Sequence, residues 1–315
     1  MKHSELVRIK RDLDCLELSG YETPLNTGIN SLRKLLESKD PGAKQMLGGI
    51  AEAQELINYQ FSSIREIIQD YKRYIVAEID RQSTEYYSIS EEIYQGTAQD
   101  SAEYILNMRK QSLTLADTDN RDLFFSRLGM YNSWKYPAVE IRPGHGEITE
   151  QIKGCDPLYL VDTADDLFGV VKTKWHEQYQ RRLRYYTIDE RSHTPLESLP
   201  NNQIGLIVSV DFFNFRTIDA IKTFLRDFYK KLRPGGVAIF TYNNCDLPYA
   251  VRNVENRFCC YTPGHAVIET ALRAGFEIIK SFDKLENISW LELRKPGDIT
   301  TLRGGQTLGE IRSFN

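Results

Sequence analysis

The sequence has few cysteines and no apolar run long enough to cross a membrane. Its five cysteines form no Cys-x-x-Cys pair, and its five histidines show no His-x-x-x-His spacing, so no metal site is predicted. A stretch of roughly 18 apolar residues is absent, and the first residues lack the apolar core of a secretory signal. We therefore expect no membrane contact and reduced cysteines in a cytoplasmic protein.

An excess of positive charge is also missing. The chain carries 40 Lys and Arg residues against 44 Asp and Glu residues, for a net charge of −4. Because binding of nucleic acid usually needs a basic surface, a nucleic-acid partner is disfavoured. The basic run at 180–184 is interpreted as the solvated end of a helix.

Glycine and proline are scarce between residues 45 and 94, where apolar residues recur at steps of three and four. The repeat consists of Ile57, Phe61, Ile64, Ile68, Tyr71 and Ile75. This spacing is typical of a coiled-coil seam, so we expect one long coiled-coil-like helix over about 44–94 within a helical domain of residues 1–117. Two explanations of the apolar stripe stay open. It packs within an intramolecular bundle, or it serves self-association or docking to a larger assembly.

Residues 16–28 contain Gly20, Pro24 and Gly28 and are predicted to form a turn-rich connection. From Pro137 onward, short β-branched and aromatic runs alternate with helical stretches, which indicates an α/β domain. The expected strands are 138–141, 158–162, 183–188, 205–210, 236–242, 276–282 and 288–294. The expected helices between them are 146–153, 165–180, 217–232 and 263–274. We predict a doubly wound, seven-stranded sheet with a closing antiparallel hairpin in residues 118–297, followed by a tail at 298–315.

The end of the first expected strand suits a nucleotide-type ligand. The strand 138–141 runs into a loop that contains Gly144 and Gly146, which let the backbone turn sharply and approach a ligand. The second expected strand ends at Asp162, and an acid at that position can accept hydrogen bonds from a ribose diol.

The segment Glu140 to Thr149 resembles the first motif of class I S-adenosylmethionine-dependent methyltransferases. That motif is an acid, a hydrophobe and Gly-x-Gly-x-Gly, and here Arg142 replaces the first glycine. The resemblance covers about residues 120–296 and continues through five further segments. These are Asp162, Asp189, Leu199 to Asp211, Leu232-Arg233-Pro234-Gly235-Gly236, and Ala274-Gly275-Phe276-Glu277. It implies a Rossmann-like methyltransferase fold that binds S-adenosyl-L-methionine.

The resemblance also implies roles for individual residues. Glu140, Gly144 and Gly146 would shape the pocket around the methionyl part of the cofactor. Asp162 would bind the ribose hydroxyls, Asp189 would lie near the adenine, and Asp211 would line the pocket beside the sulfonium. For Asp162 and Asp189, the structural alternative is a solvated loop carboxylate.

Arg142 departs from the family pattern, and two consequences are open. Its guanidinium could pair with the carboxylate of the ligand. It could instead form a salt bridge with Glu140 or Asp162, fill the pocket and leave a non-catalytic fold.

Tyr242 and Asp246 follow the fifth expected strand and are the candidate catalytic residues, in contact with the methyl acceptor. Their structural alternative is a pair of turn or helix caps. The chain lacks the Asn/Asp-Pro-Pro-Tyr sequence of amino-methyltransferases at this position, which disfavours base or glutamine methylation. The acceptor stays unidentified.

Several segments also resemble methyltransferase-like proteins of tailed phages, cyanophages in particular. Examples are the segments 141–144, 241–246 and 302–306. This resemblance implies a location in the host cytoplasm or the virion, and a structural or adaptor protein as the alternative function. An NAD-dependent oxidoreductase is disfavoured, because Thr149 stands where that fingerprint needs glycine or alanine.

Overall fold

The computed structural model describes residues 1–16, 18–36, 41–110, 118–284 and 288–297. The chain divides into two compact units, Met1–Thr84 and Glu85–Asn315, and the division lies inside a helix. The domain boundary expected at residue 117 stays a prediction. Within the described ranges, no helix is both long and apolar enough to span a bilayer.

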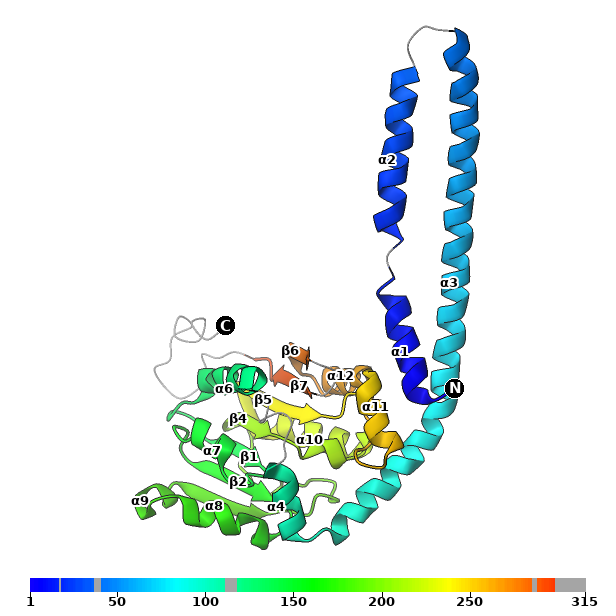
Figure 1. The fold of residues 1–315 in the computed structure, drawn as a ribbon. Coiled ribbons are helices and arrows are strands. Elements are labelled where there is room, and N and C mark those ends of the chain that lie inside the picture. The colour runs from blue at the N-terminus through cyan, green and yellow to red at the C-terminus, as the bar shows by residue number, and fades with distance from the viewer. Residues whose placement is uncertain (17, 37–40, 111–117, 285–287, 298–315) are drawn as a thin grey trace. The chain divides into compact units, whose positions relative to one another are not determined.

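The first unit is a helical hairpin. It contains α1 (His3–Asp14), α2 (Ser19–Leu36) and most of α3 (Pro41–Gly96). Three contacts show the relative direction of these helices: Gln54 with Asn26, Lys72 with Asp14, and Gln82 with the carbonyl of Met1. As the residue number rises along α3 its partner's number falls, so α1 and α2 run antiparallel to α3 (Figure 1). The long helix expected from the sequence is confirmed.

The helix α2 differs from the expectation for residues 16–28. It begins at Ser19 and contains Pro24, although an internal proline costs about 3 kcal/mol relative to alanine. The hydroxyl of Thr27 donates to the carbonyl of Thr23 at 2.8 Å, a helical i to i−4 contact directly beside the proline. The expected turn-rich connection is therefore wrong from Ser19 onward, where the backbone is helical.

The apolar seam of α3 is shifted from the expected one. Ile75 is buried and Ile57 is half-buried, whereas Ile64 is 44% and Tyr71 61% exposed. A straight α-helix has 3.6 residues per turn and drifts away from a strict seven-residue repeat. Lys72 takes the inward position instead of Tyr71, and its ammonium pairs with Asp14 at 3.1 Å.

The second unit is built on a seven-stranded sheet. Its strands are β1 (Ala138–Ile141), β2 (Leu158–Asp162), β3 (Leu183–Thr187), β4 (Ile204–Ser209), β5 (Leu232–Tyr242), β6 (Glu277–Lys284) and β7 (Ile288–Arg294). They lie in the order β3-β2-β1-β4-β5-β7-β6; β1 to β5 are parallel, and β7 is antiparallel to both its neighbours. This is the strand order of the class I methyltransferase fold, and the predicted sheet with its closing hairpin is confirmed. The order reverses between β1 and β4, which is where such sheets bind ligands.

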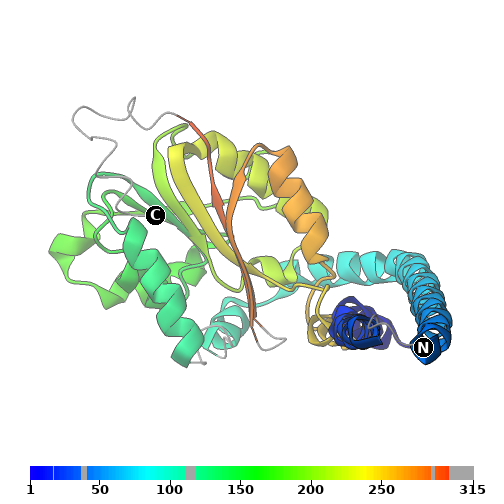
Figure 2. The same ribbon diagram turned by 90° about the horizontal axis from the view of Figure 1, so that it is seen from above.

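Helices cover both faces of the sheet (Figure 2). They include α6 (Thr118–Tyr131), α7 (Glu147–Gln151), α8 (Gly169–Lys174), α9 (Glu177–Gln180), α10 (Ile218–Lys231), α11 (Pro248–Glu255) and α12 (Gly264–Arg273). Phenylalanines of α10 and the buried residues of α12 pack on one face, and α6, α7 and α8 pack on the other. Short 3-10 turns are η1 (Thr97–Gln99), η2 (Asp165–Phe168) and η3 (Phe213–Phe215), and α4 (Ala102–Lys110) precedes the sheet.

One helical prediction in this unit was wrong, and one helix was not predicted. The expected helix 165–180 is divided into η2, α8 and α9, because Trp175 and His176 have extended backbones. The amide of Gln180 donates to the carbonyls of Lys172 and Trp175, which satisfies acceptors that a continuous helix would use. The helix α11 was missed, although Pro248 stands at its first turn, a position that favours proline.

The last turns of α3 belong to the second unit. The hydroxyl of Ser90 accepts the backbone N–H of Tyr261 at 2.6 Å, and Tyr94 is 8% exposed. These contacts anchor residues 85–96 to the sheet domain.

Candidate functional site

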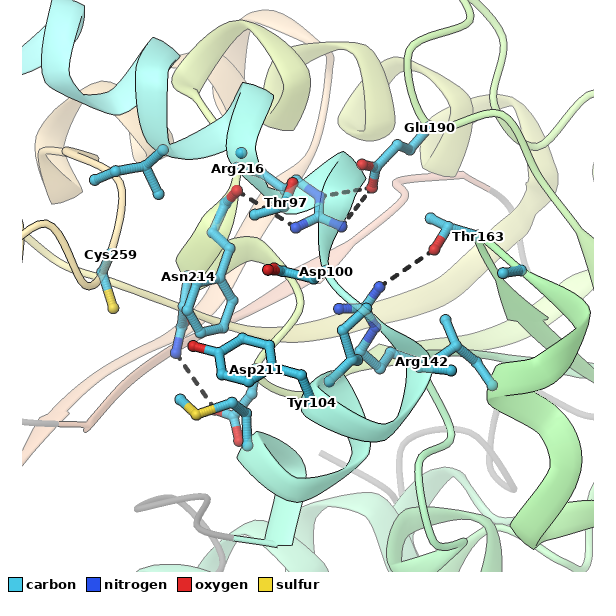
Figure 3. Close-up of a pocket in the computed structure, with 18 of the residues that line it drawn as sticks. Thr97, Asp100, Tyr104, Arg142, Thr163, Glu190, Asp211, Asn214, Arg216 and Cys259 are labelled. Carbon is cyan, nitrogen blue, oxygen red and sulfur yellow. Dashed lines mark hydrogen bonds and ion pairs between the residues drawn. The ribbon is translucent and has the colours of Figure 1, made fainter.

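A cavity of about 1180 Å³ lies at the carboxyl ends of the parallel strands. Each of the first five strands contributes a residue at or just after its end: Arg142, Thr163, Ile188, Asp211 and Tyr242. Residues of α3, η1 and α4 supply another part of the lining (Figure 3). The volume slightly exceeds the roughly 300–1,000 Å³ that is usual for small-molecule sites.

The loop after β1 keeps a glycine-like backbone even where glycine is absent. Arg142 has a φ of 62°, Gly144 of 57° and Gly146 of 79°, all in the left-handed region. Such a conformation costs a residue with a side chain roughly 1–2 kcal/mol. The backbone N–H of Arg142 donates to the carbonyl of Val161 at 2.8 Å, which holds the turn against β2. The turn of the methyltransferase motif is therefore retained at the position of the first glycine.

The side chain of Arg142 forms a buried ion pair with Asp162. Its Nε and Nη2 lie 3.3 and 3.2 Å from Oδ1 of Asp162, whose side chain is 1% exposed. The backbone N–H of Thr163 donates to the same oxygen at 2.8 Å. The other oxygen, Oδ2, is buried and has no hydrogen-bond partner among the described residues. The oxygen Oδ1 of Asp162 thus accepts three N–H donors, whereas Oδ2 can still accept a hydrogen bond.

A second buried arginine lies in the wall of the cavity. Arg216 is 2% exposed, and its Nε donates to Oε2 of Glu190 at 2.7 Å. Its guanidinium carbon lies 4.1 Å from the ring centroid of Phe212 and 5.6 Å from that of Tyr94. Arg142 contacts the same Phe212 ring at 5.0 Å. Contact between a guanidinium and an aromatic ring is stabilising, so Phe212 holds both cations at the site.

Asp100, which follows η1, carries its carboxylate into the cavity near both arginines (Figure 3). Burial raises the pKa of Asp100, and the positive charges of Arg142 and Arg216 oppose that shift. Among the described residues, no ion pair joins Asp100 to either guanidinium. The carboxylate is therefore attracted to the two arginines without being locked to them.

Four of the residues expected from the sequence line the cavity: Arg142, Asp189, Asp211 and Tyr242. Asp189 is exposed, and its carboxylate accepts the backbone N–H of Arg191 at 3.0 Å. Asp211 has a φ of 54°, and its backbone N–H donates to the hydroxyl of Thr241 at 2.7 Å. Burial raises the pKa of Tyr242, so its phenol stays protonated.

The other expected residues lie outside the lining. Glu140 accepts the hydroxyl of Thr149 at 2.6 Å, which ties β1 to α7. The carbonyl of Gly146 accepts from Lys174 at 3.0 Å. Gly144 and Gly146 shape the loop, and Asp162 lies behind Arg142. The roles that the family resemblance implied for Glu140, Gly144, Gly146 and Asp162 stay predictions.

Asp246 is also outside the lining, and its contacts are those of a helix cap. Its carboxylate accepts the backbone N–H of His265 at 2.7 Å and lies 2.8 Å from Nδ1 of the same residue. His265 is in the first turn of α12. This geometry matches the structural alternative for Asp246.

Sequence reasoning missed Tyr94, Asp100, Glu190 and Arg216. The first two come from helical segments ahead of the sheet, where nothing in their spacing distinguishes them from surface residues. Arg216 offered one signal, because it directly follows an aromatic run after the fourth strand.

No family model matches the chain, and no curated protein matches it either. Among solved structures, the chain is similar to the N-methyltransferase NodS from Bradyrhizobium japonicum in complex with S-adenosyl-L-homocysteine. The two are 16% identical, the match covers 59% of this chain and 92% of that one, and the TM-score is 0.44. An S-adenosylmethionine-dependent methyltransferase from Mesorhizobium loti is 13% identical, with 57% and 99% covered and a TM-score of 0.47. The cyclase SpnF is 12% identical, with 57% and 82% covered and a TM-score of 0.44. At these levels the fold assignment depends on the strand order of the chain itself.

Proposed function

We propose that this protein binds S-adenosyl-L-methionine in the cavity and transfers its methyl group to an acceptor that is not identified. The observation that carries the proposal is Asp162, at the tip of β2, with Oδ2 buried and without a partner among the described residues. Asp162 itself is outside the lining, but its partners Arg142 and Thr163 line the cavity, so a ribose hydroxyl would reach this oxygen if the side chain of Arg142 moved aside on binding. The hydroxyl would then supply the donor that this oxygen lacks, and an unsatisfied buried carboxylate oxygen is otherwise costly.

The charges around the cavity also fit this ligand. The lining contains five carboxylates, of Asp100, Asp166, Asp189, Glu190 and Asp211, and four guanidiniums, of Arg142, Arg191, Arg216 and Arg257. A slight excess of negative charge suits a ligand that carries a sulfonium, an ammonium and one carboxylate. When bound, this cofactor would supply an electrophilic methyl group.

The residues of the chain would act by binding and orienting. Asp162 and the turn at Arg142 would bind the nucleoside part of the cofactor. Asp189, which is exposed at the edge of the cavity, would contact the adenine. Tyr242, whose burial raises its pKa, would donate a hydrogen bond to the acceptor rather than remove a proton. Alignment of the reactants and exclusion of water by α4 would make the main contribution to rate.

The test is calorimetric titration of the full chain with S-adenosylmethionine and S-adenosylhomocysteine, alongside thermal unfolding. We expect saturable heat and a rise in unfolding temperature with both ligands. Absence of heat and of any thermal shift at millimolar ligand would refute the proposal.

A second candidate is a non-catalytic structural or adaptor protein that keeps the methyltransferase fold. The ion pair between Arg142 and Asp162 favours it, because the pair occupies one oxygen of the acid that would hold a ribose. The substitution Arg142→Gly separates the two. If the wild-type chain does not bind S-adenosylhomocysteine and the variant does, Arg142 is a plug; binding by the wild-type chain supports the enzyme.

The helical hairpin supports a further part of this alternative. Exposed apolar side chains on α3 include Leu56, Tyr59, Ile67, Tyr71 and Tyr74, whose spacing brings them to one side of the helix. Such a surface favours self-association or docking to a larger assembly, of which a phage particle is one example. Sedimentation velocity at micromolar concentration tests self-association. The copy number of the chain in purified particles tests docking.

A further inference from the structure

We propose that Arg142 and Arg216 together form a subsite for a carboxylate group of the methyl acceptor, and that Asp100 lies there in its absence. The identification of the ligand as the methyl acceptor rests on the proposed function. The existence of an anion subsite does not depend on it. The evidence is the geometry of the two guanidiniums around Phe212 and the position of Asp100 (Figure 3).

The two cations are held close together by the same ring. Their guanidinium carbons lie 5.0 and 4.1 Å from the centroid of Phe212, so their separation cannot exceed the sum of these distances. Buried like charges repel each other, and a further anion near both would relieve that repulsion. The guanidinium carbon of Arg216 also lies 5.6 Å from the ring centroid of Tyr94, a second aromatic contact that favours its observed position.

Both guanidiniums have N–H donors that make no hydrogen bond to a described residue. Arg142 uses Nε and Nη2 toward Asp162 and Thr163, and its Nη1 makes no hydrogen bond to any described residue. Arg216 uses Nε and Nη2 toward Glu190 and Nη1 toward the carbonyl of Phe215. Since a guanidinium has five N–H donors, Arg216 retains two of them. Donors of this kind favour a planar oxyanion that accepts several hydrogen bonds.

The ligand group is inferred to be a carboxylate for two reasons. A carboxylate, that of Asp100, already lies in this part of the cavity, so its size and charge fit. Each arginine is also already paired with one acid, Asp162 or Glu190, so the four groups together carry no net charge. A singly charged group that bonds to the remaining N–H donors is therefore opposed less than a doubly charged one. Apolar lining from Ile93, Ile105, Met108 and Phe215 lies in the same cavity and suits an acceptor with an apolar body.

The experiment measures binding of benzoate, benzamide and phenyl phosphate to the full chain by ligand-observed NMR. We expect benzoate to bind at least tenfold more tightly than benzamide and more tightly than phenyl phosphate. The substitution Asp100→Asn should tighten benzoate binding at least threefold, because the competing carboxylate is removed. Asp166→Asn is the matched control, since it removes another exposed acid of the same cavity; we expect a change of less than twofold.

Three results would overturn the subsite. They are equal binding of benzoate and benzamide, a preference for phenyl phosphate, and equal effects of Asp100→Asn and Asp166→Asn. The double variant Arg216→Gln with Glu190→Gln, which keeps the net charge, should abolish benzoate binding. If it does not fold, the comparison of the two aspartate variants still decides.

A last measurement distinguishes a subsite for the acceptor from a subsite for the cofactor. We expect benzoate affinity to be unchanged when S-adenosylhomocysteine is saturating. Competition between the two would assign the arginines to the carboxylate of the cofactor and refute the acceptor role. If S-adenosylhomocysteine does not bind at all while benzoate does, the proposed function fails and the anion subsite remains.

Discussion

Arg127 on α6 forms a bidentate ion pair with Glu292 on β7, a carboxylate that is fully buried. Its Nε and Nη2 donate to the two carboxylate oxygens at 2.9 and 2.5 Å, and the hydroxyl of Tyr131 makes a third contact. This pair fastens the helix that precedes β1 to the closing hairpin.

We expect Arg127→Met to destabilise the chain by about 3 kcal/mol or more, because Glu292 loses its partner while it stays buried. The control is Arg121→Met on the same helix, where the ion pair with Asp122 is exposed and its loss is expected to change stability by at most about 0.5 kcal/mol. Urea unfolding at pH 7 measures both. Equal stabilities of the two variants would contradict the buried role of the pair.

The substitution Asp162→Asn should weaken binding of S-adenosylhomocysteine about fivefold. A hydrogen bond to a charged acceptor contributes about 1 kcal/mol more than one to a neutral acceptor, and Asn keeps an oxygen for Arg142. The control is Asp165→Asn, three residues further along, whose carboxylate is exposed and pairs with Lys172. Calorimetry compares the affinities, and an unchanged value for Asp162→Asn would remove this residue from the ligand site.

The cysteines should differ strongly in reactivity. Burial raises the pKa of Cys155 to about 11 and of Cys260 to about 12, and it raises that of Cys259 still further. A thiol reacts as the thiolate, and a raised pKa lowers the thiolate fraction at neutral pH. We expect iodoacetamide at pH 7.5 to modify the exposed Cys15 first.

Modification of the buried thiols should require either denaturant or a pH that approaches their raised pKa. Peptide mass spectrometry over time gives the rates for each site. Labelling of Cys259 as fast as Cys15 in the native chain would show that the wall of the cavity opens readily.

The exposed apolar surface of α3 should support self-association. We expect the double variant Ile67→Glu with Tyr71→Glu to sediment as a monomer at a concentration where the wild-type chain is larger, because carboxylates resist burial in an apolar contact. Arg73→Glu, at an exposed position of the same helix, is the control for added charge. A monomeric wild-type chain at tens of micromolar would exclude self-association.

Much of the sheet was predictable, because its strands are short apolar runs bounded by glycine, proline and polar turns. The strand expected at 138–141 is β1 to the residue, and the closing hairpin followed from two runs separated by a short turn. The predicted C-terminal tail at 298–315 lies outside the described residues.

Only part of the cavity lining could be predicted from the sequence. Arg142 and Asp211 follow strands, and strand ends are where parallel sheets place ligands. Asp100 reaches the same cavity from the segment between η1 and α4, and its approach is decided by packing between segments far apart in the chain. Asp246 shows a further difficulty, since a polar residue after a strand caps a helix just as well as it contacts a substrate, and the sequence does not distinguish the two roles.

The contacts of Ser90 and Tyr94 bear on where this protein can be shortened. A chain that begins at Thr118, ahead of the first strand, would leave Arg216 with one aromatic neighbour instead of two and would deprive Tyr261 of the acceptor for its N–H. Because Ile93 and Gly96 of this part of α3 line the cavity, we expect the smallest fragment that retains the cavity to start no later than Glu85. The sheet and its own helices would then enclose only part of that space, and the end of α3 would be an integral part of the second unit.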